Sequence, residues 1–164
     1  MWKKELLQAR EKWYLKNYEA ARDFGVPIAK SYKDDNTNGL TKCIYDWLKF
    51  HNHYVNRINT QGQVRIEKIQ LAFGNVRKNV RWTKGTTNRG TADIDSIINS
   101  KPVKIEVKCA GTKDRMSDNQ NKEKDRIESA GGVYIIATGM DMFCDWYKQF
   151  ITENGRVLVA PGRN

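Results

Sequence analysis

Two acidic residues and a lysine have the spacing needed to bind a metal ion and to activate water. The segment Val-Lys-Ile-Glu-Val-Lys, which ends at Lys108, alternates apolar and polar residues, so Glu106 and Lys108 face the same side of an extended strand. Asp93 and Asp95 alternate in the same way and share a face of the preceding segment. If the two segments pair as a hairpin, a carboxylate from each strand can approach one cation.

Such a cation would suit the cleavage of a phosphodiester. Mg²⁺ prefers hard oxygen ligands, typically one or two carboxylates together with phosphate and water. The bound metal neutralises the phosphate and lowers the pKa of its water, and a nearby ammonium orients that water or stabilises developing charge. A Glu-x-Lys triplet alone is common by chance, and a strand with one solvent-facing side also explains it.

The distribution of charge favours a polyanionic partner. The chain of 164 residues carries 29 Lys and Arg against 19 Asp and Glu, a formal net charge of +10. Residues 41–90 hold most of the surplus and attract nucleic acid, although a solvated basic face explains the charge equally well. The candidates for contacts with DNA in this segment are Arg57, Gln61, Arg77, Arg81, Lys84 and Arg89.

Composition indicates one folded domain in a reducing compartment. Hydrophobic residues make up 39% and charged residues 29% of the chain, and no apolar run approaches the roughly 20 residues of a membrane helix. The three cysteines, Cys43, Cys109 and Cys144, are odd in number and far apart. We therefore expect a soluble cytoplasmic protein with no membrane partner and no small-molecule organic cofactor.

Hydrophobic periodicity predicts a mixed α/β fold. Periods of three to four residues indicate helices, alternation indicates strands, and Gly-containing breaks mark the turns. This order fits a mixed sheet between helices better than the strict alternation of a doubly wound fold. The expected elements are helices at 2–24 and 40–51, strands at 54–59, 63–70, 75–82, 91–98 and 101–108, a helix at 117–130, a strand at 133–137, a helix at 140–150 and a last strand at 156–160.

Four short segments follow one another in the order typical of a nuclease family. They are Arg89-Gly90-Thr91-Ala92-Asp93, Ile105-Glu106-Val107-Lys108, Ser117-Asp118-Asn119-Gln120 and Ala130-Gly131-Gly132-Val133-Tyr134. With them the chain resembles the VRR-NUC branch of the PD-(D/E)XK nuclease superfamily, and especially its small stand-alone phage and bacterial members, across roughly residues 39–150. The resemblance implies a restriction-endonuclease-like core, a central mixed β-sheet flanked by helices, over residues 38–164. Residues 1–37 would form an N-terminal helical extension.

The resemblance also implies a role for each residue of the site. Asp93 and Glu106 would bind Mg²⁺, or Mn²⁺ in its place, with the backbone carbonyl of Val107 as a further ligand. Lys108 would act on the attacking water. Gln120 would reach the site from the following helix, as the equivalent glutamine does in this branch.

Some of these positions have a second interpretation. Asp95 lies on the same face of the strand as Asp93, and only the match of Gly-Thr-Ala-Asp to the family motif favours Asp93 as the metal ligand. Ser117-x-x-Gln120 is also a capping box, whose glutamine satisfies backbone donors at the start of a helix. Family members often carry an acidic residue near the start of the first core helix, where this chain has Asn38. Asn38 and Asp95 are therefore additional candidates for the site.

The expected function is that of a Mg²⁺-dependent DNA endonuclease. Single-domain members of this branch resemble Holliday-junction resolvases, which implies branched DNA as the substrate and a homodimer that makes paired cuts. The alternatives are a non-catalytic nucleic-acid-binding module on the same fold, or a nuclease for flaps, nicks, single strands or RNA. The intact set of Asp93, Glu106 and Lys108 favours an enzyme, because two neighbouring carboxylates are costly without a metal. The resemblance places the protein in a bacterial or phage-infected cell.

Overall fold

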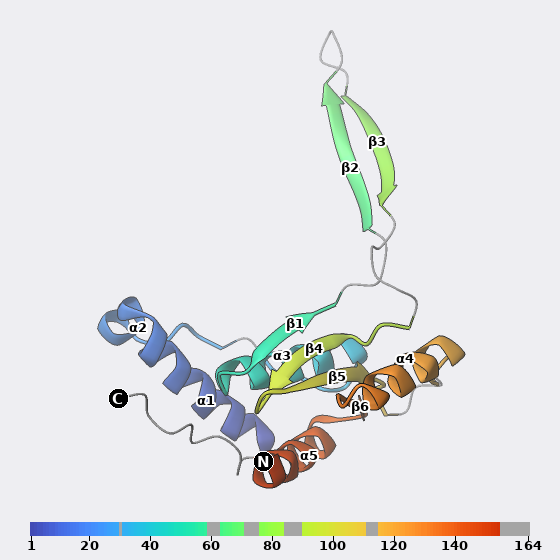
Figure 1. Ribbon diagram of the computed structural model, residues 1–164. Coiled ribbons are helices and arrows are strands. Elements are labelled where there is room, and N and C mark those ends of the chain that lie inside the picture. The colour runs from blue at the N-terminus through green and yellow to red at the C-terminus, as the bar shows by residue number, and fades with distance from the viewer. Residues whose placement is uncertain (30, 59–62, 71–75, 84–89, 111–114, 155–164) are drawn as a thin grey trace, which may run out of the picture.

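A four-stranded mixed sheet lies at the centre of the molecule (Figure 1). The computed structural model describes all residues except 30, 59–62, 71–75, 84–89, 111–114 and 155–164. Across the sheet, the strands are β1 (Tyr54–Arg57), β4 (Ile94–Ile98), β5 (Lys101–Val107) and β6 (Val133–Ala137). The first three are antiparallel neighbours, whereas β5 and β6 run parallel. The predicted mixed α/β class is confirmed.

The hairpin of β4 and β5 has the two faces that its alternation predicts. Its turn, Asn99-Ser100, has positive φ at both residues (48° and 65°), as in the two-residue turns that join twisted strands. Ile94 of β4 pairs with Ile105 of β5, and both side chains are fully buried, as is Val103. One face of the hairpin therefore belongs to the core, and the other carries the polar residues.

Helices flank the sheet. They are α1 (Trp2–Asn17), α2 (Glu19–Phe24), α3 (Thr37–Phe50), α4 (Asp118–Ser129) and α5 (Met140–Asn154). α3 and α5 contribute Trp47 and Phe143 to one core with the apolar face of the sheet, and α1 packs on α3 and adds Leu6 to it. α4 lies beside β6 and has no buried residue. No helix in the described part of the chain is both long and apolar enough to cross a bilayer.

The expectation of one helix over residues 2–24 is wrong, because the chain breaks at Tyr18. That residue is extended, with φ −131° and ψ 122°, and separates α1 from α2. The Asn17 side chain donates a hydrogen bond to the Trp13 carbonyl at 2.7 Å, and the Tyr18 ring stacks on Tyr14. The extended backbone at Tyr18 ends the helix where apolar periodicity predicts that it continues.

α3 begins three residues earlier than predicted, and this places Asn38 inside its first turn. The Asn36 side chain accepts a hydrogen bond from the Gly39 amide at 2.9 Å, which is an N-cap. A Cβ at Gly39 would lie 2.4 Å from the carbonyl oxygen of Lys33, so the glycine lets the preceding connector pass close to the helix. The Gly that resembled a loop residue is therefore part of the helix.

A second, two-stranded sheet is separate from the central one. It consists of β2 (Gln63–Gln70) and β3 (Val76–Thr83), paired antiparallel, and both strands were predicted within one residue. The ribbon is inserted between β1 and β4 and stands away from the rest of the molecule (Figure 1). The strand predicted at 156–160 lies outside the described residues.

Candidate active site

The Asp93 side chain lies beside the segment of β5 that carries Glu106. Ile94 pairs with Ile105, so the same register places the preceding Asp93 opposite Glu106. Oδ2 of Asp93 accepts a hydrogen bond from the backbone amide of Val107 at 2.9 Å. This register gives Asp93 and Glu106 a common face, and the hydrogen bond holds the Asp93 carboxylate on the peptide that follows Glu106.

Glu106 is a buried carboxylate surrounded by donors from three elements. Only 3% of the residue is exposed. Lys108 Nζ lies 3.1 Å from Oε1, and the amide nitrogen of Gln120 donates to the same oxygen. The Tyr134 hydroxyl of β6 lies 3.5 Å from the other oxygen, Oε2. A buried carboxylate needs such partners, because an unpaired charge or acceptor inside the fold is costly.

Gln120 satisfies both interpretations of its segment. The Gln120 side-chain oxygen accepts a hydrogen bond from the Ser117 backbone amide at 2.9 Å. The Gln120 backbone amide donates to Ser117 Oγ at 3.3 Å, and the two bonds form a capping box. Its side-chain nitrogen donates to Glu106 at the same time. The cap therefore orients the glutamine, and the free end of its amide group is directed to the carboxylate.

Gly90 brings the loop before β4 against the start of α4. Its φ is +87°, and a Cβ there would lie 2.4 Å from the carbonyl oxygen of Asn119 and 2.9 Å from the amide of Gln120. Only glycine permits both this backbone conformation and this approach. The glycine in Gly-Thr-Ala-Asp thus sets the distance between the strand that carries Asp93 and the helix that carries Gln120.

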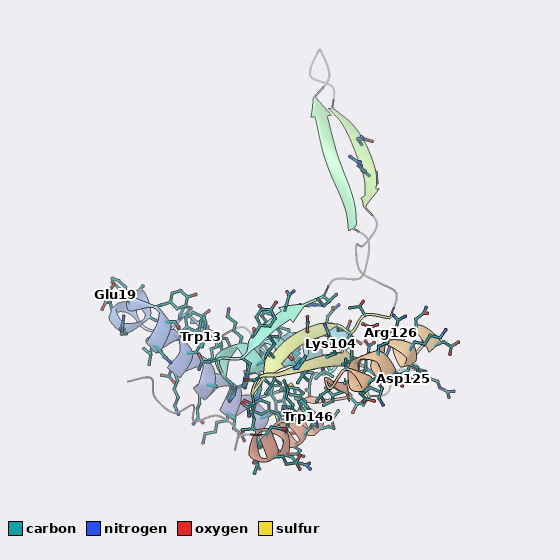
Figure 2. The ribbon with its side chains drawn as sticks, viewed as in Figure 1. Trp13, Glu19, Lys104, Asp125, Arg126 and Trp146 are labelled. Atoms are coloured by element: carbon teal, nitrogen blue, oxygen red, sulfur yellow. The ribbon has the colours of Figure 1, made fainter. Side chains whose placement is uncertain are left out.

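Asp95 belongs to a different ion pair on the same face. Its Oδ1 lies 2.9 Å from Lys104 Nζ, and the two side chains are 32% and 25% exposed. The labelled Lys104 is drawn on β5 in Figure 2. Asp93, by contrast, bonds to the strand segment of Glu106 and Lys108. The geometry therefore selects Asp93 over Asp95 as the partner of Glu106.

Asn38 and Arg57 form an exposed pair next to Asp93. Arg57 Nη2 donates to Asn38 Oδ1 at 2.8 Å, from the end of β1 to the first turn of α3. The following amide, of Ile58, donates to the Asp93 carbonyl at 2.8 Å and ties this end of β1 to the site. In place of an acidic side chain, this chain presents an amide and a guanidinium at the edge of the site.

The other candidates for contacts with DNA lie elsewhere in the chain. Arg81 is exposed on β3, and Arg77 belongs to the same strand. Gln61, Lys84 and Arg89 lie outside the described residues. Of the candidates that the structure describes, Arg57 bonds to Asn38, and its neighbour Ile58 bonds to the Asp93 backbone.

Tyr134 was not among the residues predicted for the site. Burial, followed by the charges of Glu106 and Asp93, raises the pKa of its phenol well above the usual range, so the hydroxyl keeps its proton. A protonated hydroxyl can donate to Glu106. Tyr134 ends the fourth of the short segments that resemble the nuclease family, which was the one signal for it in the sequence. Its pairing with Lys104 shows that it lies on the polar face of the sheet, and the sequence did not give that pairing.

The donor set suits a hard cation. Two carboxylates and one ammonium give Asp93, Glu106 and Lys108 a formal charge of −1. Within the described ranges, no three His, Cys, Asp or Glu residues group closely enough to hold a metal by themselves. Mg²⁺ commonly binds through one or two carboxylates and completes its shell with water and substrate phosphate, so two suffice. Asp93 and Glu106 therefore provide the donors that such an ion needs.

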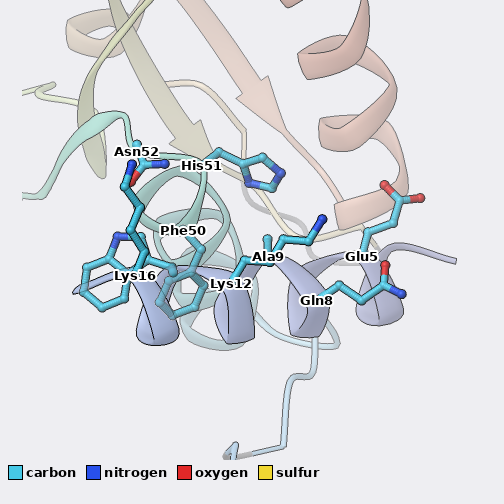
Figure 3. Close-up of a pocket in the computed structure, with 9 residues that line it drawn as sticks. Glu5, Gln8, Ala9, Lys12, Lys16, Phe50, His51 and Asn52 are labelled. Atoms are coloured by element: carbon cyan, nitrogen blue, oxygen red, sulfur yellow. The ribbon is translucent and has the colours of Figure 1, made fainter. Parts of the chain in front are cut away.

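A pocket of about 450 Å³ lies away from this cluster, between α1 and the end of α3 (Figure 3). It opens at the C-terminal end of α3, whereas Asn38 lies in the first turn of that helix. None of the residues predicted for the site lines it. The lining residues are Glu5, Gln8, Ala9, Lys12, Trp13, Lys16, Phe50, His51 and Asn52.

The likeness to VRR-NUC nucleases is carried by the four short segments. Three of them supply Asp93, Glu106 with Lys108, and Gln120, and the fourth supplies Tyr134; these side chains lie in one cluster. A scan against models of protein families and a search of curated proteins find no match to this chain.

Proposed function

We propose that this chain is a metal-dependent DNA endonuclease that hydrolyses phosphodiester bonds on a restriction-endonuclease-like core of the VRR-NUC type. The observation that supports this proposal is the cluster around Glu106. Lys108, directly after β5, and Gln120, in the first turn of α4, contact this buried carboxylate, and Asp93, directly before β4, bonds to the backbone amide of the next residue, Val107. A cluster that served stability alone would not need two carboxylates together, because their mutual repulsion is costly.

Asp93 and Glu106 would hold the metal, Mg²⁺ or Mn²⁺. The Val107 amide points at Asp93, and a strand residue directs its amide and carbonyl to the same neighbour, so we expect the Val107 carbonyl on that side as a further oxygen ligand. When bound, such an ion neutralises the phosphate and lowers the pKa of a water. The cluster has a formal charge of −1, which favours the ion before the DNA phosphate arrives.

Lys108 and Gln120 would act through the same oxygen of Glu106, Oε1. The Lys108 side chain is 12% exposed, and its ammonium lies 3.1 Å from the carboxylate. It can therefore orient an attacking water and stabilise negative charge on the phosphate. Gln120 has no charge to contribute, and its amide fixes the direction of the carboxylate. Arg57, whose side chain bonds to Asn38, would be a contact for the phosphate backbone.

We further propose branched DNA, of the Holliday-junction type, as the substrate. This step rests on the family resemblance, as does the homodimer that would place two sites for symmetric cuts. The cytoplasm is the proposed location, because Cys43, Cys109 and Cys144 are buried thiols that form no disulfide.

The test is cleavage of defined DNA substrates by the purified protein. Linear duplex, single strand, flap and four-way junction would be incubated with Mg²⁺, with Mn²⁺ or with EDTA. We expect metal-dependent cleavage, strongest on the junction. Asp93→Asn and Glu106→Gln should abolish it while DNA binding persists, and Asp95→Asn should retain it as a matched control. Full activity of either site variant would refute the site, and binding without cleavage in every condition would identify a non-catalytic module.

A further inference from the structure

Within the described part of the chain, the β2–β3 ribbon stands apart from the central sheet and its helices. Its strands pair only with each other, and Figures 1 and 2 show the ribbon standing away from the helices and the central sheet. Ile66 and Val80 form an opposite pair on the ribbon and are 59% and 64% exposed. An isolated two-stranded hairpin is at best marginally stable in water. The exposed apolar pair and the missing support indicate that the ribbon works with a partner.

The charge along the ribbon is positive and unfavourably arranged. The register places Arg65 opposite Arg81 and Lys68 opposite Lys78. Like charges directly opposite each other destabilise a pair of strands, so neither arrangement helps the ribbon to fold. A negatively charged ligand would reduce the repulsion within both pairs. The sixteen residues of the two strands hold five basic residues and one acidic, which are Arg65, Lys68, Arg77, Lys78, Arg81 and Glu67.

The two like-charged pairs lie at alternating positions, so they belong to opposite faces of the ribbon. The pairs 65–81 and 67–79 share one face, and the pairs 66–80 and 68–78 share the other. Each face therefore carries one basic pair. A second copy of the ribbon would bring positive charge against positive charge, whichever face it used. A polyanion that surrounds the ribbon complements both faces.

We propose that the β2–β3 ribbon is a DNA-binding arm that inserts into the groove of a duplex next to the cleavage site. The major groove of B-DNA, about 12 Å wide, accepts a two-stranded β-ribbon, and there basic residues meet phosphates on both walls. Apolar side chains such as Ile66 and Val80 can contact thymine methyl groups at the groove floor. The ribbon thus fits duplex DNA by shape, by charge and by its exposed apolar pair.

The position of the arm in the chain links it to the candidate active site. The ribbon is inserted between β1, which ends at Arg57, and β4, which follows Asp93. Its eight-residue strands are about 27 Å long at the usual rise per residue, which matches about eight base pairs at 3.4 Å each. A duplex held by the arm would therefore extend to one side of the cut. The location of the cut rests on the proposed function, whereas DNA binding by the arm does not.

The first test is DNA binding without metal, measured by fluorescence anisotropy in EDTA over a series of salt concentrations. The variant Lys78→Glu with Arg81→Glu turns both like-charged pairs into opposite-charged pairs, which should support the ribbon while it weakens DNA binding. Loss of two phosphate contacts flattens the slope of log K against log salt by about 1.8, which corresponds to roughly 60-fold weaker binding at 0.1 M salt. The charge-matched control, Lys4→Glu with Lys16→Glu on exposed positions of α1, should bind nearly as the parent does.

A second variant replaces residues 63–83 with a short Gly-Ser linker and should lose binding to a similar degree. Circular dichroism and thermal melting would establish that the central domain of each variant is folded. DNA affinity and salt slope equal to those of the control would overturn the proposal. A change from dimer to monomer in light scattering, with duplex affinity retained, would assign the ribbon to contact between subunits and would overturn it as well.

The same measurements separate this proposal from the nuclease assignment. If the ribbon variants bind duplex weakly but no metal supports cleavage by the parent protein, the arm stands and the proposed function fails. If Asp93→Asn abolishes cleavage while the ribbon variants bind DNA as the parent does, the proposed function stands and the arm fails.

Discussion

Replacing Lys108 with methionine removes an ammonium from the candidate site and leaves most of the side-chain volume. In the parent protein, Lys108 Nζ lies 3.1 Å from Glu106, and the two side chains are only 12% and 4% exposed. Breaking a buried ion pair typically costs about 3–5 kcal/mol, because one charge remains buried without its partner. Gln120 and Tyr134 still contact Glu106, so we expect a loss of about 3 kcal/mol, at the lower end of that range.

Cleavage should suffer more than stability. A positioned charge or proton-transfer group contributes about 10²–10⁴ in rate, which is about 2.7–5.4 kcal/mol of barrier. Metal affinity should be unchanged or higher, because the loss of Lys108 leaves two carboxylates at the site and no ammonium. Mn²⁺ should therefore raise the melting temperature of the variant at least as much as that of the parent, since a ligand stabilises the state that binds it.

The matched control is Lys104→Met, which acts on the same strand face. Lys104 pairs with Asp95 at 2.9 Å, but these side chains are 25% and 32% exposed, and such a pair is worth only about 0–1 kcal/mol. Single-turnover cleavage and urea unfolding of both variants would provide the comparison. Equal loss of cleavage in the two variants would refute a specific role for Lys108 and would point to a general effect of positive charge. Parent-like cleavage by Lys108→Met would refute the role outright.

Three further predictions concern the support of the site and the pH dependence of the fold. Gln120→Ala should lower the cleavage rate by roughly 10–100-fold, the usual effect of losing a residue that supports a metal ligand. Ser117→Ala removes the helix cap, so it should lower the stability in thermal unfolding by only about 1 kcal/mol and leave most of the cleavage activity. Gly90→Ala should reduce both stability, by about 1–3 kcal/mol in urea unfolding, and cleavage, because the new Cβ meets the backbone at the start of α4 and φ is +87°; cleavage at the parent level would show that α4 needs no such approach. Burial lowers the pKa of His53 below 6.5, so the folded state resists its protonation. The melting temperature should therefore hold above a pH of about 6.5 and fall as the pH drops below that value, and His53→Gln should flatten the profile between about pH 7 and 5.

Sequence patterns predicted the structure best where alternation and turn residues determine the backbone conformation. The alternation around Ile105 and the Asn99-Ser100 turn predicted the hairpin, whereas its register, and with it the facing of Asp93 relative to Glu106, came from the structure. Helix ends were predicted less well, because they depend on single residues. Asn36 caps α3 and the extended Tyr18 ends α1, and apolar periodicity contains neither signal.

The separation of the β2–β3 ribbon from the central sheet could not be predicted. Its strands alternate about as well as those of the sheet, and alternation states which residues share a face but not which strand lies next to which. The contacts of Tyr134 with Glu106 and of Arg57 with Asn38 were missed for the same reason. Each joins residues that are 28 or 19 positions apart, and only the fold brings them together.

The Glu-x-Lys triplet gains its meaning from the way in which the fold surrounds it. Glu106 contacts Lys108 on its own strand, Gln120 on α4 and Tyr134 on β6, while Asp93 bonds to the next peptide of β5. These contacts form together only when the hairpin, the parallel strand and the capped helix are all in place. A triplet that occurs by chance would have a solvated glutamate, whereas here the fold buries that glutamate and surrounds it with donors. The burial of Glu106, rather than the triplet itself, is therefore what distinguishes this face of the sheet as a site.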